Sequence, residues 1–154
     1  MTACQQLVAE ELDYVCRFHE LLQTENQCLK SGALEDLEAI SRKKSILIPE
    51  LEARTRARLA FFEITEPTTA SVNAGRWFAE NPHEREAQKS WQDLLQKAAQ
   101  ARDLHKANEV LVSMLLQRTS AALDILVQRQ REQTTYGSNG QASIPTGSRI
   151  IDSA

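Results

Sequence analysis

The residues of this chain that could support catalysis or metal binding are three histidines and three cysteines among 154 residues. His83 opens the run His-Glu-Arg-Glu, but position 87 is alanine, so the second histidine of the helical zinc-protease pattern is missing. No glycine-rich loop follows a strand pattern, and no serine or cysteine lies in a recognisable nucleophile turn. The sequence therefore predicts no catalytic residue, no metal site and no cofactor, and a protein that is not an enzyme.

The three cysteines, Cys4, Cys16 and Cys28, follow one another at intervals of twelve residues. On one helix this interval turns successive thiols by about 120°, so they cannot converge on a metal ion or form a disulfide. We expect free, partly buried thiols in a reducing compartment.

The composition favours one soluble helical domain. It argues against a protein that binds nucleic acid or a membrane through its net charge. Charged residues make up 25% of the chain and the formal net charge is −3, so neither nucleic acid nor an anionic membrane is attracted. Uninterrupted apolar runs such as Ile46-Leu47-Ile48 are too short to cross a bilayer, and the N-terminus is acidic where a signal peptide would be basic. We expect a cytoplasmic protein without membrane insertion.

The first half of the chain has the pattern of an antiparallel helical hairpin. Between residues 5 and 29, apolar positions alternate spacings of four and three, as in a helix that packs along others. Gly32 suits the left-handed backbone that ends a helix, and a second apolar pattern runs from Leu34 to Phe62. Pro49 lies inside this second pattern and either kinks or breaks the helix; the continuing apolar phase favours a kink. Its many basic residues are interpreted as a solvated face.

A long third helix should follow a short connection. Residues 65–82 are predicted to form a loop around one helical turn at residues 74–79, where Trp77 and Phe78 close one end of a bundle. A third helix over residues 84–132 would span roughly 70 Å, against roughly 45 Å for each arm of the hairpin. One end of the third helix must therefore extend beyond the hairpin. Residues 114–132, at its C-terminal end, still carry many apolar side chains. Such an exposed apolar strip marks a partner site.

The predicted fold class is all-α. It comprises an antiparallel helical hairpin plus one long C-terminal helix in a three-helix coiled-coil-like bundle, with a short extra helix and a disordered C-terminal tail. Residues 133–154 are rich in glycine and serine and have few apolar side chains, so they cannot bury enough surface to offset their ordering entropy. The predicted division is a helical domain at residues 1–132 and a flexible tail at residues 133–154.

A few polar and aromatic residues have two interpretations each. Asn26 and Asn108 fall on apolar seams, where a buried polar side chain commonly fixes helix register, and recognition of a partner is the alternative. His19 and His105 also fall on apolar seams and are expected to be hydrogen-bonded core residues. Tyr136 follows the last apolar stripe and either caps the bundle or offers its ring to a pocket on another protein.

The order of several motifs along the chain is characteristic. The later ones are Asn108, the cluster Leu111, Leu115 and Leu116, then Ala122-Leu123 with Leu126, and the terminal Tyr136-Gly137-x-x-Gly140-Gln141. The earlier ones are Leu22-Gln23-Thr24-Glu25, Ala33-Leu34-Glu35-Asp36-Leu37 and Lys44-Ser45-Ile46-Leu47. Together they resemble the FlgN family of flagellar export chaperones over nearly the whole chain. The chain departs from the family pattern at two places. Pro49 lies inside the second helix, and Ser138-Asn139 stand between the terminal glycines, where the family often has a proline and an aspartate.

The resemblance implies a cytoplasmic chaperone that binds flagellar hook–filament junction subunits of the FlgK and FlgL type. It would prevent their premature assembly and deliver them to the flagellar type III export gate. Docking to the gate protein FlhA is implied for Tyr136, and residues 1–132 become the chaperone domain. The implied client-binding residues are Asn108, Leu111, Leu115, Leu116, Ala122, Leu123 and Leu126.

Two other functions fit the same pattern of residues. One is a structural coiled-coil protein that associates with itself through the apolar strip. The other is an adaptor of another secretion system. The client, the stoichiometry and the bound conformation of the tail stay open.

Overall fold

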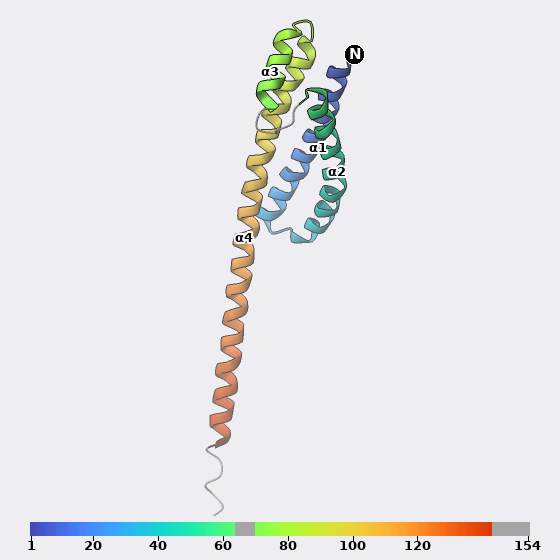
Figure 1. Ribbon diagram of the computed structural model, residues 1–154. Helices are drawn as coiled ribbons and strands as arrows, with labels where there is room; N and C mark the ends of the chain where they lie inside the picture. Colours follow the sequence, from blue (N-terminus) through green and yellow to red (C-terminus); the bar gives the residue numbers. More distant parts are fainter. Residues whose placement is uncertain (64–69, 143–154) are drawn as a thin grey trace, which may run out of the picture. The chain divides into compact units, whose positions relative to one another are not determined.

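The computed structural model describes residues 1–63 and 70–142, and every regular element in these residues is a helix. Helix α1 spans Ala3–Ser31, a 3-10 turn spans Leu34–Asp36, α2 spans Leu37–Phe61, α3 spans Ala70–Glu80 and α4 spans Arg85–Ala142 (Figure 1). The predicted all-α class, with a hairpin, a short extra helix and one long C-terminal helix, is confirmed. The chain divides into two compact units, Met1–Leu111 and Val112–Ala154.

The ends of α1 follow from local capping. The Thr2 hydroxyl accepts a hydrogen bond from the Gln5 amide at 3.2 Å and so begins the helix. Gly32 has φ = 79°, and its amide donates to the Cys28 carbonyl at 3.0 Å. This left-handed backbone is tolerated because glycine has no Cβ, so the predicted stop at Gly32 is confirmed.

Helix α2 contains Pro49 without interruption. Proline has no amide hydrogen, so the Ser45 carbonyl lacks its usual helical donor four residues later. The neighbouring hydrogen bonds keep the helix continuous from Leu37 to Phe61. The alternative of a helix broken at Pro49 is therefore wrong.

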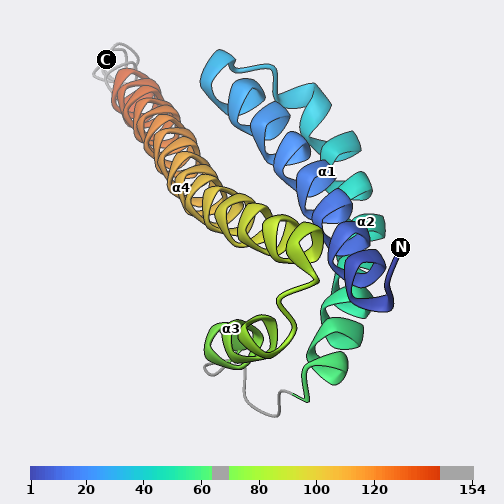
Figure 2. The same cartoon turned by 90° about the horizontal axis from the view of Figure 1, so that it is seen from above.

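Polar contacts fix the directions of the helices in the first unit. Glu11 of α1 pairs with Arg58 of α2, whereas Glu25 of α1 pairs with Lys44 at 3.0 Å, so the two helices run antiparallel. In the contacts between α1 and α4, by contrast, the residue numbers of both helices rise together. Thr2 donates to Glu84 at 2.7 Å just before the two helices begin, and Gln5 donates to Glu86 at 2.5 Å. Asn26 donates to Asn108 at 2.8 Å, so α1 and the first part of α4 run parallel (Figure 2).

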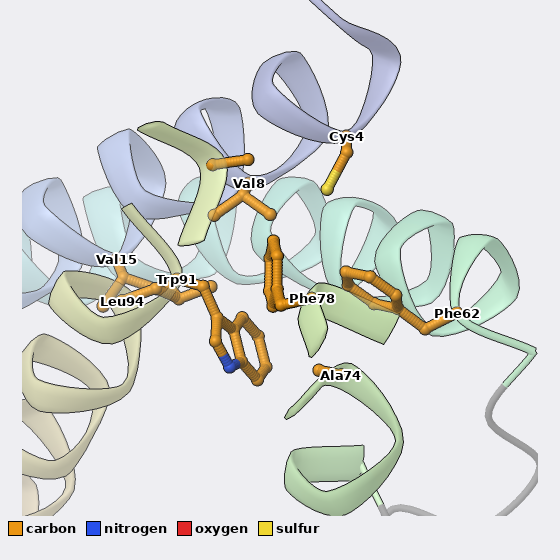
Figure 3. Packing of buried hydrophobic residues seen from close by; sticks show 9 residues of the cluster. Cys4, Val8, Val15, Phe62, Ala74, Phe78, Trp91 and Leu94 are labelled. Atoms are coloured by element: carbon orange, nitrogen blue, oxygen red, sulfur yellow. The ribbon is translucent and has the colours of Figure 1, made fainter. Parts of the chain in front are cut away.

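The core of the first unit is built around aromatic rings (Figure 3). Phe62 at the end of α2 lies with its ring centroid 5.4 Å from Trp77, 5.9 Å from Phe78 and 6.1 Å from Trp91. The expected packing role of Trp77 and Phe78 is confirmed, and the helix that carries them, α3, is longer than the single turn predicted. Part of the predicted loop, residues 64–69, lies outside the described residues. The buried cluster comprises Cys4, Val8, Val15, Phe62, Ala74, Phe78, Ala87, Trp91 and Leu94.

The interpretation of the basic residues of α2 as a solvated face is wrong for Lys44 and Arg58. The Arg58 side chain is only 11% exposed, pairs with the buried carboxylate of Glu11 and lies 4.9 Å over the Trp91 ring. Arg54 lies 3.8 Å over the Tyr14 ring. A helix pattern identifies which residues share a face. It does not show that two arginines of that face each cover an aromatic ring of another helix.

Helix α4 is longer than predicted. It ends at Ala142 rather than near residue 132, so Tyr136 belongs to the helix. By compactness the chain divides after Leu111, and the division into a domain at residues 1–132 and a flexible tail at residues 133–154 stays a prediction. The rest of the predicted tail, residues 143–154, lies outside the described residues.

Asn108 is the most connected polar residue between α1 and α4. It is 2% exposed, its amide donates to the Leu22 carbonyl at 3.0 Å and to Glu25 at 2.9 Å, and its carbonyl oxygen accepts from Asn26. Glu25 in turn binds Lys44 of α2. The network therefore joins all three long helices, as the register-fixing interpretation of Asn26 and Asn108 requires.

We predict that Asn108→Ala lowers the free energy of unfolding by about 2 kcal/mol, because it leaves buried polar partners unsatisfied. Chemical denaturation monitored by circular dichroism measures this loss. Gln117→Ala, at an exposed site of the same helix, is the matched control and should change stability by less than about 0.5 kcal/mol. Unchanged stability of Asn108→Ala would contradict the register role and leave recognition as the explanation.

Candidate partner-binding site

The second unit exposes an apolar face of α4. Leu116 is 65% exposed, Leu123 is 56% exposed and Leu126 is 60% exposed. Their spacings of seven and three residues place them along one side of the helix. None of residues 112–137 is buried. The apolar side that these residues form with Val112, Leu115, Ala122 and Val127 is called the apolar strip below.

The strip continues the pattern of the buried seam of α4. In the first unit this seam includes Ala101 at 6% exposure, the partly buried Leu104 and the buried Asn108. Leu111 and Leu115 follow at the next spacings of three and four residues. The sequence therefore repeats in the second unit the kind of face that packs against α1 in the first unit.

The predicted client-binding residues fall into two groups. Asn108 is buried and Leu111 is partly exposed, and both belong to the first unit. Leu115 is partly exposed in the second unit. The exposed members, all in the second unit, are Leu116, Ala122, Leu123 and Leu126.

Tyr136 is 79% exposed and lies on a different face of the helix from Leu126. Ten residues separate the two, which corresponds to directions about 80° apart. Ile125 at 53% and Met114 at 46% exposure are further accessible apolar residues that lie away from the strip. This second face was not predicted, although the helical spacing of Ile125 and Tyr136 indicates it.

The hairpin carries another accessible apolar site that was missed. Leu21 of α1 and Ile46 and Leu47 of α2 line a groove of about 440 Å³, rimmed by charged and polar side chains. Ile46 is 73% exposed. The outward position of Ile46 could not be recognised from the sequence, because it lies in a continuous apolar run.

The titratable residues of the described chain do not assemble into a reactive site. No group of His, Cys, Asp and Glu within residues 1–63 and 70–142 could hold a metal ion. His19 and His105 are only partly buried, contrary to the expected core positions, and His105 pairs with Glu109 at 3.3 Å. Burial lowers the pKa of His19, and nearby Lys97 adds to this effect. Burial also raises the pKa of the free Cys4 thiol to about 11, with a further contribution from Glu84.

The exposed part of α4 is apolar enough to raise the question of a membrane. Among the described residues, the helical stretch Arg85–Gly137 contains 18 consecutive residues with a mean hydropathy of 1.5, none of them buried. Polar residues interrupt this stretch, so it contains no long uninterrupted apolar run. Length and composition alone are weak evidence for a span, and Arg118 and Asp124 lie within the apolar region of the helix. Each such charge costs roughly 2.5 to 3.5 kcal/mol at the centre of a bilayer.

These features describe a helical protein with a self-contained core and an accessible apolar helix face. Comparison with curated proteins and with solved structures found no match. The model of the FlgN protein family matches residues 1–144, which include α1 to α4. The chain therefore belongs to the FlgN family, whose members are flagellar export chaperones.

Proposed function

We propose that this protein binds hook–filament junction subunits of the FlgK and FlgL type in the cytoplasm through the apolar strip. The bound client is kept from premature assembly and delivered to the export gate protein FlhA. Tyr136 contacts the gate. The observation that carries the proposal is the exposure of the strip, together with the membership of the chain in a family of flagellar chaperones.

The strip offers enough apolar surface for a helix of a partner. Burying one leucine fully contributes roughly 1.5 to 3 kcal/mol relative to leaving it in water. Leu116, Leu123 and Leu126 are each more than half exposed, so a partner helix can recover most of this energy at each position. Apolar residues at helical spacings favour a mode in which the two helices pack along each other.

Asn108 differs from the leucines of the apolar strip because its side chain is buried. Its side chain is engaged with Leu22, Glu25 and Asn26, so it is accessible to a client only if that network opens. We propose that it holds the start of the client-binding helix in register. The client contacts then come mainly from residues of the second unit.

The first test uses a double substitution in the strip. Leu123→Asp combined with Leu126→Asp should abolish binding of a FlgK- or FlgL-type subunit, because two carboxylates would be desolvated against the client. The free energy of unfolding should change by less than about 1 kcal/mol, since both sites are exposed. Calorimetric titration with the purified subunit and thermal melts measure the two quantities.

Gln117→Asp combined with Gln128→Asp is the matched control, because it adds the same charge to exposed positions outside the strip. It should bind the client like the unaltered protein. If the strip variant instead unfolded, its leucines would be core residues. If a large homo-oligomer formed in place of a complex with the client, the structural coiled-coil alternative would gain support.

The second test separates the gate from the client. Tyr136→Ala should weaken binding to the cytoplasmic domain of FlhA by roughly 2 kcal/mol, a usual cost of removing an aromatic anchor. Client affinity should stay nearly unchanged, because Tyr136 lies outside the strip. Truncation after Gln133 should give the same pattern, and Thr135→Ala serves as the neighbouring control. A loss of client binding with intact gate binding would place Tyr136 in the client site instead.

A further inference from the structure

The last turns of α4 in the first unit are attached to the hairpin by few side chains. The buried aromatic cluster takes its last buried member on α4 from Leu94. Between residues 102 and 137, Asn108 is the only side chain of the described chain that is buried. Leu104 and Leu111 are partly buried. The attachment of this segment to α1 therefore depends mainly on the hydrogen bonds of Asn108.

These hydrogen bonds allow the Asn108 amide only one orientation. Its nitrogen donates to the Leu22 carbonyl at 3.0 Å and to a carboxylate oxygen of Glu25 at 2.9 Å. Its oxygen accepts from Asn26 at 2.8 Å. A reversed amide would place its oxygen against the carboxylate and its nitrogen against the Asn26 amide nitrogen. The bond to Glu25 has a charged acceptor and is therefore the strongest of the three.

Glu25 in turn depends on a residue of α2. The Lys44 ammonium lies 3.0 Å and 3.2 Å from the two oxygens of the Glu25 carboxylate. Lys44 and Asn108 donate to the same oxygen, Oε2. The Glu25 side chain is only 16% exposed, and so little exposure is costly for a carboxylate without a cation beside it. Without Lys44 the carboxylate would turn toward water, and Asn108 would lose its charged acceptor.

We propose that Glu25 is a positioning residue that links α2 to the part of α4 that leads into the apolar strip. Lys44 holds the Glu25 carboxylate, Glu25 holds the Asn108 amide, and Asn108 keeps residues 102–111 ordered against α1. The first residue of the strip, Val112, follows directly. This inference rests on the proposed function, because it concerns the client only if the strip binds the client.

The first test measures local opening without any partner. Lys44→Met removes the ammonium and keeps the apolar stem. Amide hydrogen exchange of residues 102–111, followed by mass spectrometry, should become at least about tenfold faster, as expected for the loss of a charged hydrogen-bonding group. Exchange of residues 87–98, which pack in the aromatic core, should change less than about threefold. Equal acceleration of both segments would show a general loss of stability and overturn the positioning role.

Two matched variants control for the substitution itself. Lys44→Arg keeps a cation beside Glu25 and should retain slow exchange of residues 102–111. Lys43→Met changes the neighbouring lysine, which is exposed, and should also leave this exchange unchanged. Fast exchange in either variant would contradict a specific role of the Lys44 charge.

A double-mutant cycle tests whether Glu25 transmits the effect. Because Lys44 and Asn108 act through the same carboxylate, Lys44→Met combined with Asn108→Ala should exchange about as fast as Asn108→Ala alone. If the accelerations of the two single variants multiply in the double variant, the residues act independently and the link through Glu25 is wrong.

Client binding distinguishes this inference from the function on which it rests. Lys44→Met should bind a FlgK- or FlgL-type subunit about fivefold more weakly, because part of the binding energy is then used to order residues 102–111. If the variant with Leu123→Asp and Leu126→Asp still binds the subunit, the proposed function itself is wrong. If that variant loses binding while Lys44→Met binds normally, only the positioning role is wrong.

Discussion

The parallel pairing of α1 with α4 is the constraint on which the rest of the structure depends. Hydrogen bonds between Thr2 and Glu84 and between Asn26 and Asn108 both join residues 82 positions apart, so the register is the same at both ends of α1. The apolar seam of α4 is buried or partly buried at Ala101, Leu104, Asn108 and Leu111 in the first unit, whereas none of residues 112–137 in the second unit is buried.

The two units use the same helix for different purposes. In the first unit, aromatic rings and the ion pair of Glu11 with Arg58 enclose a buried core. In the second unit no described side chain of residues 112–137 is buried, so the helix relies on its own backbone hydrogen bonds and on local propensity. Isolated helices are only marginally stable in water. A bound partner would therefore stabilise this part of α4 by burying its apolar side chains.

Local chemistry made several features predictable. Gly32 as a helix stop, the antiparallel hairpin and the aromatic role of Trp77 and Phe78 all follow from residue type and spacing, and the structure agrees. The end of α4 was misplaced because Thr134, Thr135 and Gly137 have weak helix propensity, although the helix continues past them. The roles of Lys44 and Arg58 were missed because their partners, Glu25, Glu11 and Trp91, come from other helices.

The sequence by itself determined the helical class, the family and which residues share each face of α4, because periodicity and motif order are properties of the chain alone. It could not determine what covers those faces. Leu104 and Leu126 fall in the same kind of apolar pattern, yet the first is partly buried and the second is 60% exposed. Only the tertiary structure decided this difference, because burial depends on where α1 begins and ends relative to α4, and that register is fixed by contacts between residues far apart in the chain.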